Sequence, residues 1–224
     1  MRVLIVSATE KEIYPIIKSI GIDGAVIGEI MSGRYNEMDI DVLITGSGIL
    51  ATSYVVSKAF ANNKGQWSLV INLGVAGSFH KNVPIGEVVN VNCDMQADFG
   101  AEDHEEFLPA SEIGLCTDND YIFNNDIAIG NTVLDKLKKV KGTTVNTAHG
   151  NETRIQEFKK RFVPDVETME GAAFFYAVLK EKIPCIQIRC ISNYVEKRDK
   201  TKWNIDLAIE NLNAVILKAI RNGF

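Results

Sequence analysis

The stretch Leu69-Val70-Ile71-Asn72-Leu73-Gly74-Val75-Ala76-Gly77 best shows how this chain of 224 residues folds. Its first half is almost continuously apolar, without the polar alternation of a strand that has one exposed face. Its second half carries two glycines, which let other groups approach the backbone closely. The stretch therefore predicts a strand buried on both faces, in a sheet covered by helices on either side.

Similar apolar runs recur along the chain and alternate with helical patterns. The predicted strands cover residues 2–7, 40–45, 68–73, 86–92 and 184–191. The predicted helices run from Glu10 to Ile20, Ala51 to Asn62, Asn131 to Val140, Glu152 to Arg161, Thr168 to Lys182 and Asn204 to Ile220. This alternation predicts an α/β fold: a single three-layer domain over residues 1–224, with a mixed, mostly parallel central sheet flanked by helices.

Composition excludes several classes of protein. The chain has 24 Lys and Arg against 29 Asp and Glu, a net charge of −5, and no long basic cluster, which argues against a nucleic-acid partner. No apolar stretch approaches the roughly 20 residues that cross a bilayer, so we expect no membrane span. The apolar run Val3-Leu4-Ile5-Val6 is too short for a signal peptide, and we expect a cytoplasmic protein. Four cysteines without C-x-x-C spacing and three scattered histidines predict no structural zinc.

The segment from Asp94 to Asp126 differs from its surroundings because it is polar, acidic and weakly periodic. We expect a long loop there. Its acidic part, residues 98–109, is either a functional loop that covers substrate or contacts another subunit, or a charged loop exposed to solvent. The sequence alone does not decide between these two interpretations. Its carboxylates and His104 match no known ligand spacing, so we expect no metal.

Glycines also mark the ends of two successive strands. Thr45-Gly46-Ser47-Gly48-Ile49-Leu50-Ala51 superficially fits the dinucleotide fingerprint G-x-G-x-x-A. The fingerprint needs a carboxylate about 20 residues on, and residues 69–77 contain none, so we expect no nicotinamide cofactor. With Gly74-Val75-Ala76-Gly77, the stretch predicts one pocket at the carboxyl edge of the sheet.

Three polar side chains are candidates for chemistry at that edge. Glu12 follows the first strand, where it either interacts with the helix dipole or serves the site, and the sequence alone favours neither. Glu170 precedes the apolar helix start Gly171-Ala172-Ala173, and a carboxylate at the mouth of a buried helix usually binds something. Asn193 ends a strand, where it either turns the chain or offers an amide to a ligand.

Taken in order, these segments resemble the purine nucleoside phosphorylase-like family. The closest likeness is to its hydrolase branch, the methylthioadenosine/adenosylhomocysteine nucleosidases and the futalosine hydrolases. The resemblance spans nearly the whole chain, through Ile5 to Glu12, Thr45 to Ala51, Asn72 to Gly77, Pro84 to Val88, Met169-Glu170 and Arg189 to Asn193.

The resemblance implies a role for each candidate. Glu12 activates water, Glu170 holds the ribose hydroxyls and Met169 packs against the sugar. The glycine-lined strand ends supply further substrate-binding residues, namely Gly48, Val75, Ala76 and Gly77. Phosphorylases of the family carry a phosphate-binding glycine and arginine after the first strand. Ser7 to Glu12 contains neither, so we expect hydrolysis without any metal or organic cofactor.

Asn193 stands where adenine-specific members carry an aspartate. The two N–H donors of an amide match O6 and N7 of hypoxanthine, which are both acceptors. Together with the charged loop, this implies hydrolysis of futalosine, an intermediate of a menaquinone pathway, to hypoxanthine and dehypoxanthine futalosine. Two alternatives stay open: an adenine-releasing methylthioadenosine/adenosylhomocysteine nucleosidase, and a non-catalytic nucleoside-binding protein.

Three further points stay open at this stage. The family implies a homodimer or larger homo-oligomer, although the sequence does not fix its size. It also does not say which of residues 145–151 stack on the base, or what the 5′ substituent of the nucleoside is. Glu167 departs from the spacing of the adenine-specific members and receives no role.

Overall fold

The computed structural model describes residues 1–63 and 66–224. Its strands are β1 (Arg2–Ser7), β2 (Ile30–Tyr35), β3 (Met38–Ile44), β4 (Leu69–Ser78), β5 (Val88–Gln96), β6 (Gly100–Asp103), β7 (Glu106–Pro109), β8 (Ile122–Asn124), β9 (Lys138–Thr144), β10 (Val166–Thr168) and β11 (Cys185–Tyr194). Its α-helices are α1 (Glu10–Ser19), α2 (Ile49–Asn62), α3 (Glu152–Phe162), α4 (Gly171–Lys180) and α5 (Ile205–Asn222). Three short 3₁₀ turns complete it, η1 (Asp118–Asp120), η2 (Leu134–Lys136) and η3 (Lys200–Lys202).

The central sheet is mixed, as predicted. Nine strands belong to it, in the order β10-β9-β5-β11-β4-β1-β3-β2, with β8 attached to β5. The contacts of β1 with β3 and β4, and of β4 with β11, are parallel, whereas β5 and β11 are antiparallel. A short antiparallel pairing of β10 with β4 joins the end of this order back to its middle. Strands β4, β11, β5, β9 and β10 therefore form a closed ring.

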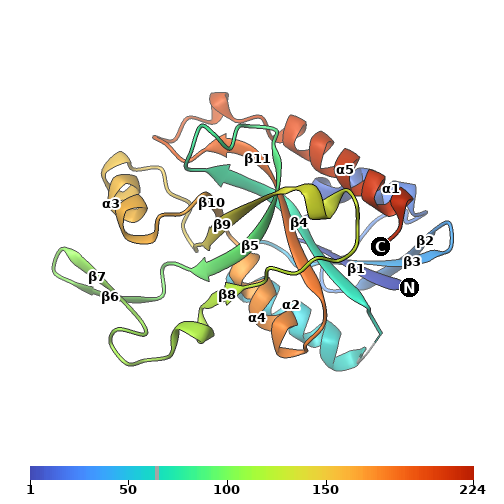
Figure 1. Cartoon of the computed structure of the whole chain (residues 1–224), viewed down its shortest axis with the longest axis horizontal. Coiled ribbons are helices and arrows are strands. Elements are labelled where there is room, and N and C mark those ends of the chain that lie inside the picture. Colours follow the sequence, from blue (N-terminus) through green and yellow to red (C-terminus); the bar gives the residue numbers. More distant parts are fainter. Residues whose placement is uncertain (64–65) are drawn as a thin grey trace.

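Helices cover both faces of the sheet, which gives the three layers (Figure 1). One core cluster combines α1 and α5 with Val3 and Ile5 of β1. The other combines α2 and α4 with Leu4 and Val6 of the same strand. All four β1 residues are at most 1% exposed, so consecutive positions of one strand enter opposite cores. The predicted α/β fold class is confirmed.

Two details of the helix prediction are wrong. Residues 131–140 do not form a helix: the turn η2 is followed by β9, in which Val140 is buried between exposed Lys139 and Lys141. Leu134, Leu137 and Val140 recur every three residues, a spacing that suggested a helix before the chain turned into a strand. The helix expected from Thr168 starts at Gly171, because Thr168 belongs to β10.

The segment from Asp94 to Asp126 is more ordered than expected. Its first residues extend β5 to Gln96, β6 and β7 form a separate hairpin, and β8 pairs with β5. The hairpin projects from the body of the molecule beside α3 (Figure 1). Four of its acidic side chains, Glu102, Asp103, Glu105 and Glu106, are exposed.

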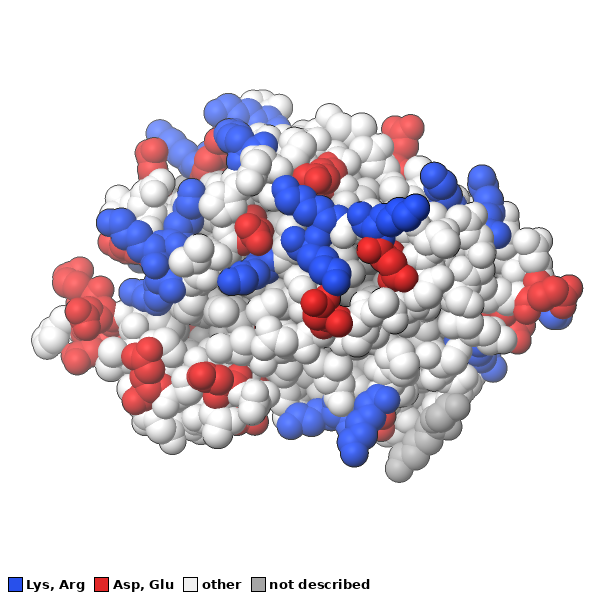
Figure 2. All heavy atoms as spheres, in the orientation of Figure 1, with Lys and Arg blue, Asp and Glu red and all other residues white. Residues whose placement is uncertain are grey.

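Charge is mixed over the face in Figure 2, where Lys and Arg side chains are interspersed with Asp and Glu. Acidic atoms gather over the β6–β7 hairpin at one end of that face. Within residues 1–63 and 66–224, no helix has both the length and the apolar character to cross a membrane.

Two of the four cysteines are buried in strand β11. Cys185 and Cys190 are free thiols with no exposed surface, and burial raises the pKa of each to about 12. Cys93 and Cys116 are half-buried. The two β11 thiols are therefore neutral side chains that fill the core.

A buried polar cluster lies where β5, β9, β11 and α4 meet. Gln187 Nε2 and Thr144 Oγ1 donate to the two oxygens of Asp94 at 2.8 and 2.9 Å. A Cβ on Gly171, the first residue of α4, would come within 2.1 Å of both Asp94 Oδ2 and Gln187 Oε1. Only glycine therefore lets the helix start reach this cluster.

Asp94 makes the stability of the fold depend on pH. Burial raises its pKa to about 6, against about 3.9 in an unfolded chain. The folded state then holds the proton more tightly, so the group stabilises the fold when it is protonated. That contribution is present below about pH 4 and is lost as the pH rises through about 6. Two pKa units correspond to roughly 3 kcal/mol.

Urea unfolding of the wild type and Asp94→Asn from about pH 4.5 to about pH 7.5 checks this. The free energy of unfolding of the variant, relative to the wild type, should increase as the pH rises. A difference that is constant over this range would show that Asp94 titrates like an exposed aspartate.

Candidate active site

Glu12 lies in the first turn of α1, at the carboxyl end of β1. Its Oε2 accepts hydrogen bonds from the backbone N–H and the hydroxyl of Thr9, at 3.1 and 2.8 Å, which is a helix-capping arrangement. Its Oε1 does something that capping does not require: it accepts from the backbone N–H of Val75 in β4, at 3.1 Å. The carboxylate is thus fixed between two strand ends.

Arg189 of β11 is a charged group of the site that sequence reasoning did not assign. It is fully buried, and Nη2 donates to Asn72 Oδ1 and to Gln187 Oε1. A Cβ on Gly74 would lie 2.0 Å from Arg189 Nη1 and 3.0 Å from Glu12 Oε1, so both groups crowd the same bare backbone. Nη1 has no hydrogen-bond acceptor in the part of the chain that the structure describes. A lone arginine in an otherwise apolar strand was the available signal.

Glu170 caps the start of α4, and it is 8% exposed. Its Oε1 accepts the backbone N–H of Gly48 at 3.0 Å. Gly48 has φ +93°, a conformation that side chains with a Cβ rarely adopt, so the glycine allows its N–H to point at the carboxylate. Among residues 1–63 and 66–224, Oε2 has no donor, which leaves it available to a ligand.

Asn193 lies at a bulge of β11, paired with Gly77 of β4. Its Nδ2 donates to the carbonyl of Tyr194 at 3.0 Å, and its Oδ1 accepts from Ser192 Oγ at 2.8 Å. The Tyr194 carbonyl can only accept, which fixes the orientation of the amide. The nitrogen lies 3.2 Å from the position that a Cβ on Gly77 would take. The sequence predicted two free N–H donors on Asn193. Because one is bound to the Tyr194 carbonyl, a single free N–H remains, and it faces the space over Gly77.

The remaining predicted residues lie along the same sheet edge. Val75 and Gly77 are half-buried in β4, and the carbonyl of buried Ala76 lies 3.3 Å from Ser192 Oγ. Met169 is half-buried in the bend between β10 and α4, directly before Glu170. The structure thus places the predicted residues at the ends of β1, β3, β4, β10 and β11.

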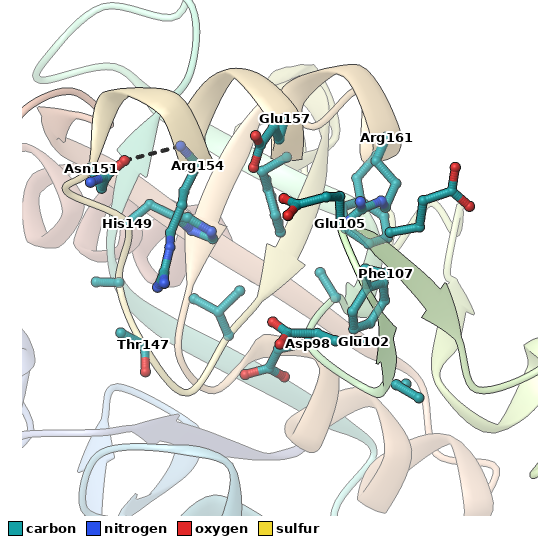
Figure 3. Close-up of a pocket in the computed structure, with 18 of the residues that line it drawn as sticks. Asp98, Glu102, Glu105, Phe107, Thr147, His149, Asn151, Arg154, Glu157 and Arg161 are labelled. Carbon is teal, nitrogen blue, oxygen red and sulfur yellow. Dashed lines mark hydrogen bonds between the residues drawn. The ribbon is translucent and has the colours of Figure 1, made fainter.

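A hollow of about 760 Å³ lies between the β6–β7 hairpin and α3 (Figure 3). None of the predicted site residues lines it, but residues 147–151 do. Arg154 and His149 point into it from α3 and the preceding loop, toward Asp98 and Glu102. Among the described residues, no group of three His, Cys, Asp or Glu side chains is placed to hold a metal ion.

A comparison with protein families decides the relationship of the chain. The model of the phosphorylase superfamily matches residues 2–221. The chain belongs to the phosphorylase superfamily. The resemblance described from the motifs is thereby confirmed, together with the interpretation of the chain as a member of a superfamily of enzymes.

Several curated relatives are nucleosidases. The futalosine hydrolase of Streptomyces coelicolor is 27% identical over 155 residues, which are 68% of this chain and 65% of that protein. The futalosine hydrolase of Acidothermus cellulolyticus is 28% identical over 177 residues, 77% of this chain and 71% of that protein. The 5′-methylthioadenosine/S-adenosylhomocysteine nucleosidase of Bacillus subtilis is 25% identical over 234 residues, covering 99% of both chains.

Solved structures share the fold over almost the full length. A futalosine hydrolase mutant of Helicobacter pylori superposes with a TM-score of 0.81 at 18% identity, covering 99% of both chains. A mutant of the methylthioadenosine/adenosylhomocysteine nucleosidase of the same organism, with 5′-methylthioadenosine in its active site, gives 0.80 at 18% identity and covers 98% of both.

Proposed function

We propose that this protein hydrolyses the N-ribosidic bond of futalosine and releases hypoxanthine and dehypoxanthine futalosine. The futalosine hydrolases among its relatives support this substrate. The reaction type is inferred from the placement of Glu12. Its Oε1 accepts the Val75 N–H and lies close to the buried Arg189 guanidinium. A carboxylate held there repels a phosphate dianion and accepts a proton from water, which favours hydrolysis over phosphorolysis.

In this reaction the bond to the base breaks early and an oxocarbenium-like sugar forms. Glu12 acts as the general base for the water that attacks the anomeric carbon. Glu170 binds the ribose hydroxyls through Oε2 and stabilises positive charge on the ring, while the Gly48 N–H holds Oε1 in place. Met169 packs against the sugar, and Val75, Ala76 and Gly77 line the floor under the base.

Asn193 reads the base through its free N–H. A free asparagine amide can also pair with adenine, by turning its oxygen to the exocyclic amine. Here the Tyr194 carbonyl holds the nitrogen and Ser192 holds the oxygen, so the amide keeps its N–H toward Gly77. That donor matches N7 or O6 of hypoxanthine and opposes the amine of adenine.

The second candidate is a methylthioadenosine/adenosylhomocysteine nucleosidase. The relative from Bacillus subtilis favours it, because that match covers 99% of both chains. The released base separates the two functions. A non-catalytic nucleoside-binding protein is disfavoured, because binding alone does not require a carboxylate beside the anomeric carbon.

We further propose that the protein acts as a homodimer or larger homo-oligomer. Leu50 and Tyr54 in the first turns of α2 are 85% and 65% exposed, and Ile27, which approaches Gly46 just before that helix, is 64% exposed. This apolar surface adjoins Gly48, and a second copy that covered it would lie next to the substrate pocket.

Incubation with futalosine, inosine or methylthioadenosine, each without phosphate, tests the function. We expect hypoxanthine and the free sugar from futalosine, with little adenine from methylthioadenosine. Added phosphate should neither accelerate release nor appear in the sugar product. Adenine as the main product would support the second candidate, and a sugar 1-phosphate would place the protein among the phosphorylases.

Glu12→Gln should abolish most turnover while substrate still binds, because the amide keeps the shape of the side chain but accepts no proton. We expect kcat to fall by roughly 10²–10⁴-fold. Glu10→Gln makes the same change in the same helical turn and should leave kcat unaltered. If Glu12→Gln turned over at a near-normal rate, Glu12 would have no part in the reaction.

Asn193→Asp changes one atom type at the base-reading position and should move the preference toward adenine. A protonated aspartic acid accepts from the adenine amine and donates to N7, whereas the wild-type amide meets that amine donor to donor. Such a mismatch costs about 1–3 kcal/mol, or one to two orders of magnitude in rate. The measurement is the ratio of kcat/KM for inosine and adenosine. An unchanged ratio would show that another group reads the base.

A further inference from the structure

The departing base needs a proton, and neither Glu12 nor Asn193 supplies one. When the bond to the sugar breaks, its electron pair passes to the purine ring. The Asn193 amide has no acidic proton to give, and Glu12 takes a proton from water instead. A group that donates a proton near Gly77 would complete the set.

His149 and Glu167 form a pair beside Gly77, because Glu167 is the partner of Gly77 in the sheet. Glu167 is buried, at 6% exposed. One of its oxygens accepts the backbone N–H of His149 at 3.0 Å, and the other bonds with His149 Nδ1. The ring also packs against Phe158 of α3, with centroids 4.3 Å apart. The imidazole is therefore fixed by two elements, with Nδ1 as the donor to the carboxylate.

The sheet register places this pair opposite Asn193. Gly77 of β4 is paired with Asn193 on one side and with Glu167 of β10 on the other. Paired residues project from the same face of a sheet. Neighbouring strands are about 4.8 Å apart, so the backbones of Asn193 and Glu167 are separated by roughly 10 Å. The bare backbone of Gly77 lies between them.

The second ring nitrogen of His149 is available. Across residues 1–63 and 66–224, Nε2 makes no hydrogen bond, and the ring lines the hollow in Figure 3. The ring is 18% exposed. A carboxylate on Nδ1 and an unoccupied Nε2 facing a cavity form the arrangement by which histidine exchanges protons with a ligand.

We propose that His149, held by Glu167, donates the proton that the purine takes up as it leaves. This inference rests on the proposed nucleoside hydrolysis. The bond between N9 and the anomeric carbon breaks, its electron pair moves into the purine, and the Nε2 proton of His149 passes to a ring nitrogen. Water adds to the anomeric carbon and loses a proton to Glu12. Solvent then returns one proton to His149 and removes one from Glu12, so the cycle closes.

Several other charged groups lie around His149. Glu167 lies on β10 directly behind the ring. Those that line the hollow are Asp98, Glu102, His104, Glu105 and Glu106 on the β5–β7 side, and Arg154, Glu157 and Arg161 on α3. Carboxylates outnumber arginines in this lining.

His149→Gln tests the proposal, because glutamine retains a donor for Glu167 and lacks a transferable proton. We expect kcat for release of hypoxanthine to fall by roughly 10²-fold, with KM little changed. The wild-type rate should decline as the pH rises and His149 loses its proton, and the variant should lack that decline. His80→Gln, the same change at a histidine that lies outside the hollow and bonds to the carbonyl of Pro164, serves as the control and should behave like the wild type.

Two outcomes would overturn the proposal. The first is a kcat of His149→Gln within about twofold of the wild type. The second is a loss of rate that retains the alkaline decline of the wild type, which would mean that His149 only shapes the pocket. A wild type that releases no base from any nucleoside would contradict the proposed function itself, so the two failures are distinguishable.

Discussion

Because Gly74 has no side chain, the buried guanidinium of Arg189 and the carboxylate of Glu12 both approach the backbone of β4 there. Arg189 is wholly inside the protein, and an uncompensated charge there would be very costly. Asn72 and Gln187 accept hydrogen bonds from Nε and Nη2, and the carboxylates of Glu12 and Asp94 lie near enough to balance its charge. The position of Glu12 thus depends on β1, β4 and β11 packing at their observed register.

Gly171 plays the corresponding role at the start of α4. It allows the start of α4 to lie against Asp94 and Gln187, and this places Glu170 within reach of the Gly48 N–H. The same polar cluster therefore supports the positions of both Glu12 and Glu170. A side chain at Gly74 would collide with Arg189 and crowd Glu12, and one at Gly171 would collide with Asp94 and Gln187.

The sequence predicted the elements whose patterns are local. The sequence predicted strands β1, β4 and β11 from their apolar runs, to within a few residues of the observed bounds. It predicted helices α1, α2, α3 and α5 equally well. Strand β9 was missed because Leu134, Leu137 and Val140 fit a helical period as well as a turn followed by a strand. Strand β10 has three residues, and its place is set by distant partners that no local pattern reveals.

The same distinction holds for the candidate site. Motif order led to Glu12, Glu170 and Asn193, yet it did not disclose that one N–H of Asn193 is engaged by the next carbonyl. The pairing of His149 with Glu167 crosses from a loop to a strand, and neither residue stands in a recognisable motif. Arg189 was visible only as a charge in an apolar run. Contacts between segments, and not residue types, decide these features.

The ring of strands has a consequence for how the protein is made. Strand β4 pairs with β1 soon after it leaves the ribosome, but its other edge waits for β11, where Val70 meets Cys185. Until then a long apolar edge is open to pairing with another chain. Closure needs contacts between distant residues, which form slowly. The nascent chain is therefore most prone to aggregate late in its synthesis, just before the strand that completes the candidate site appears.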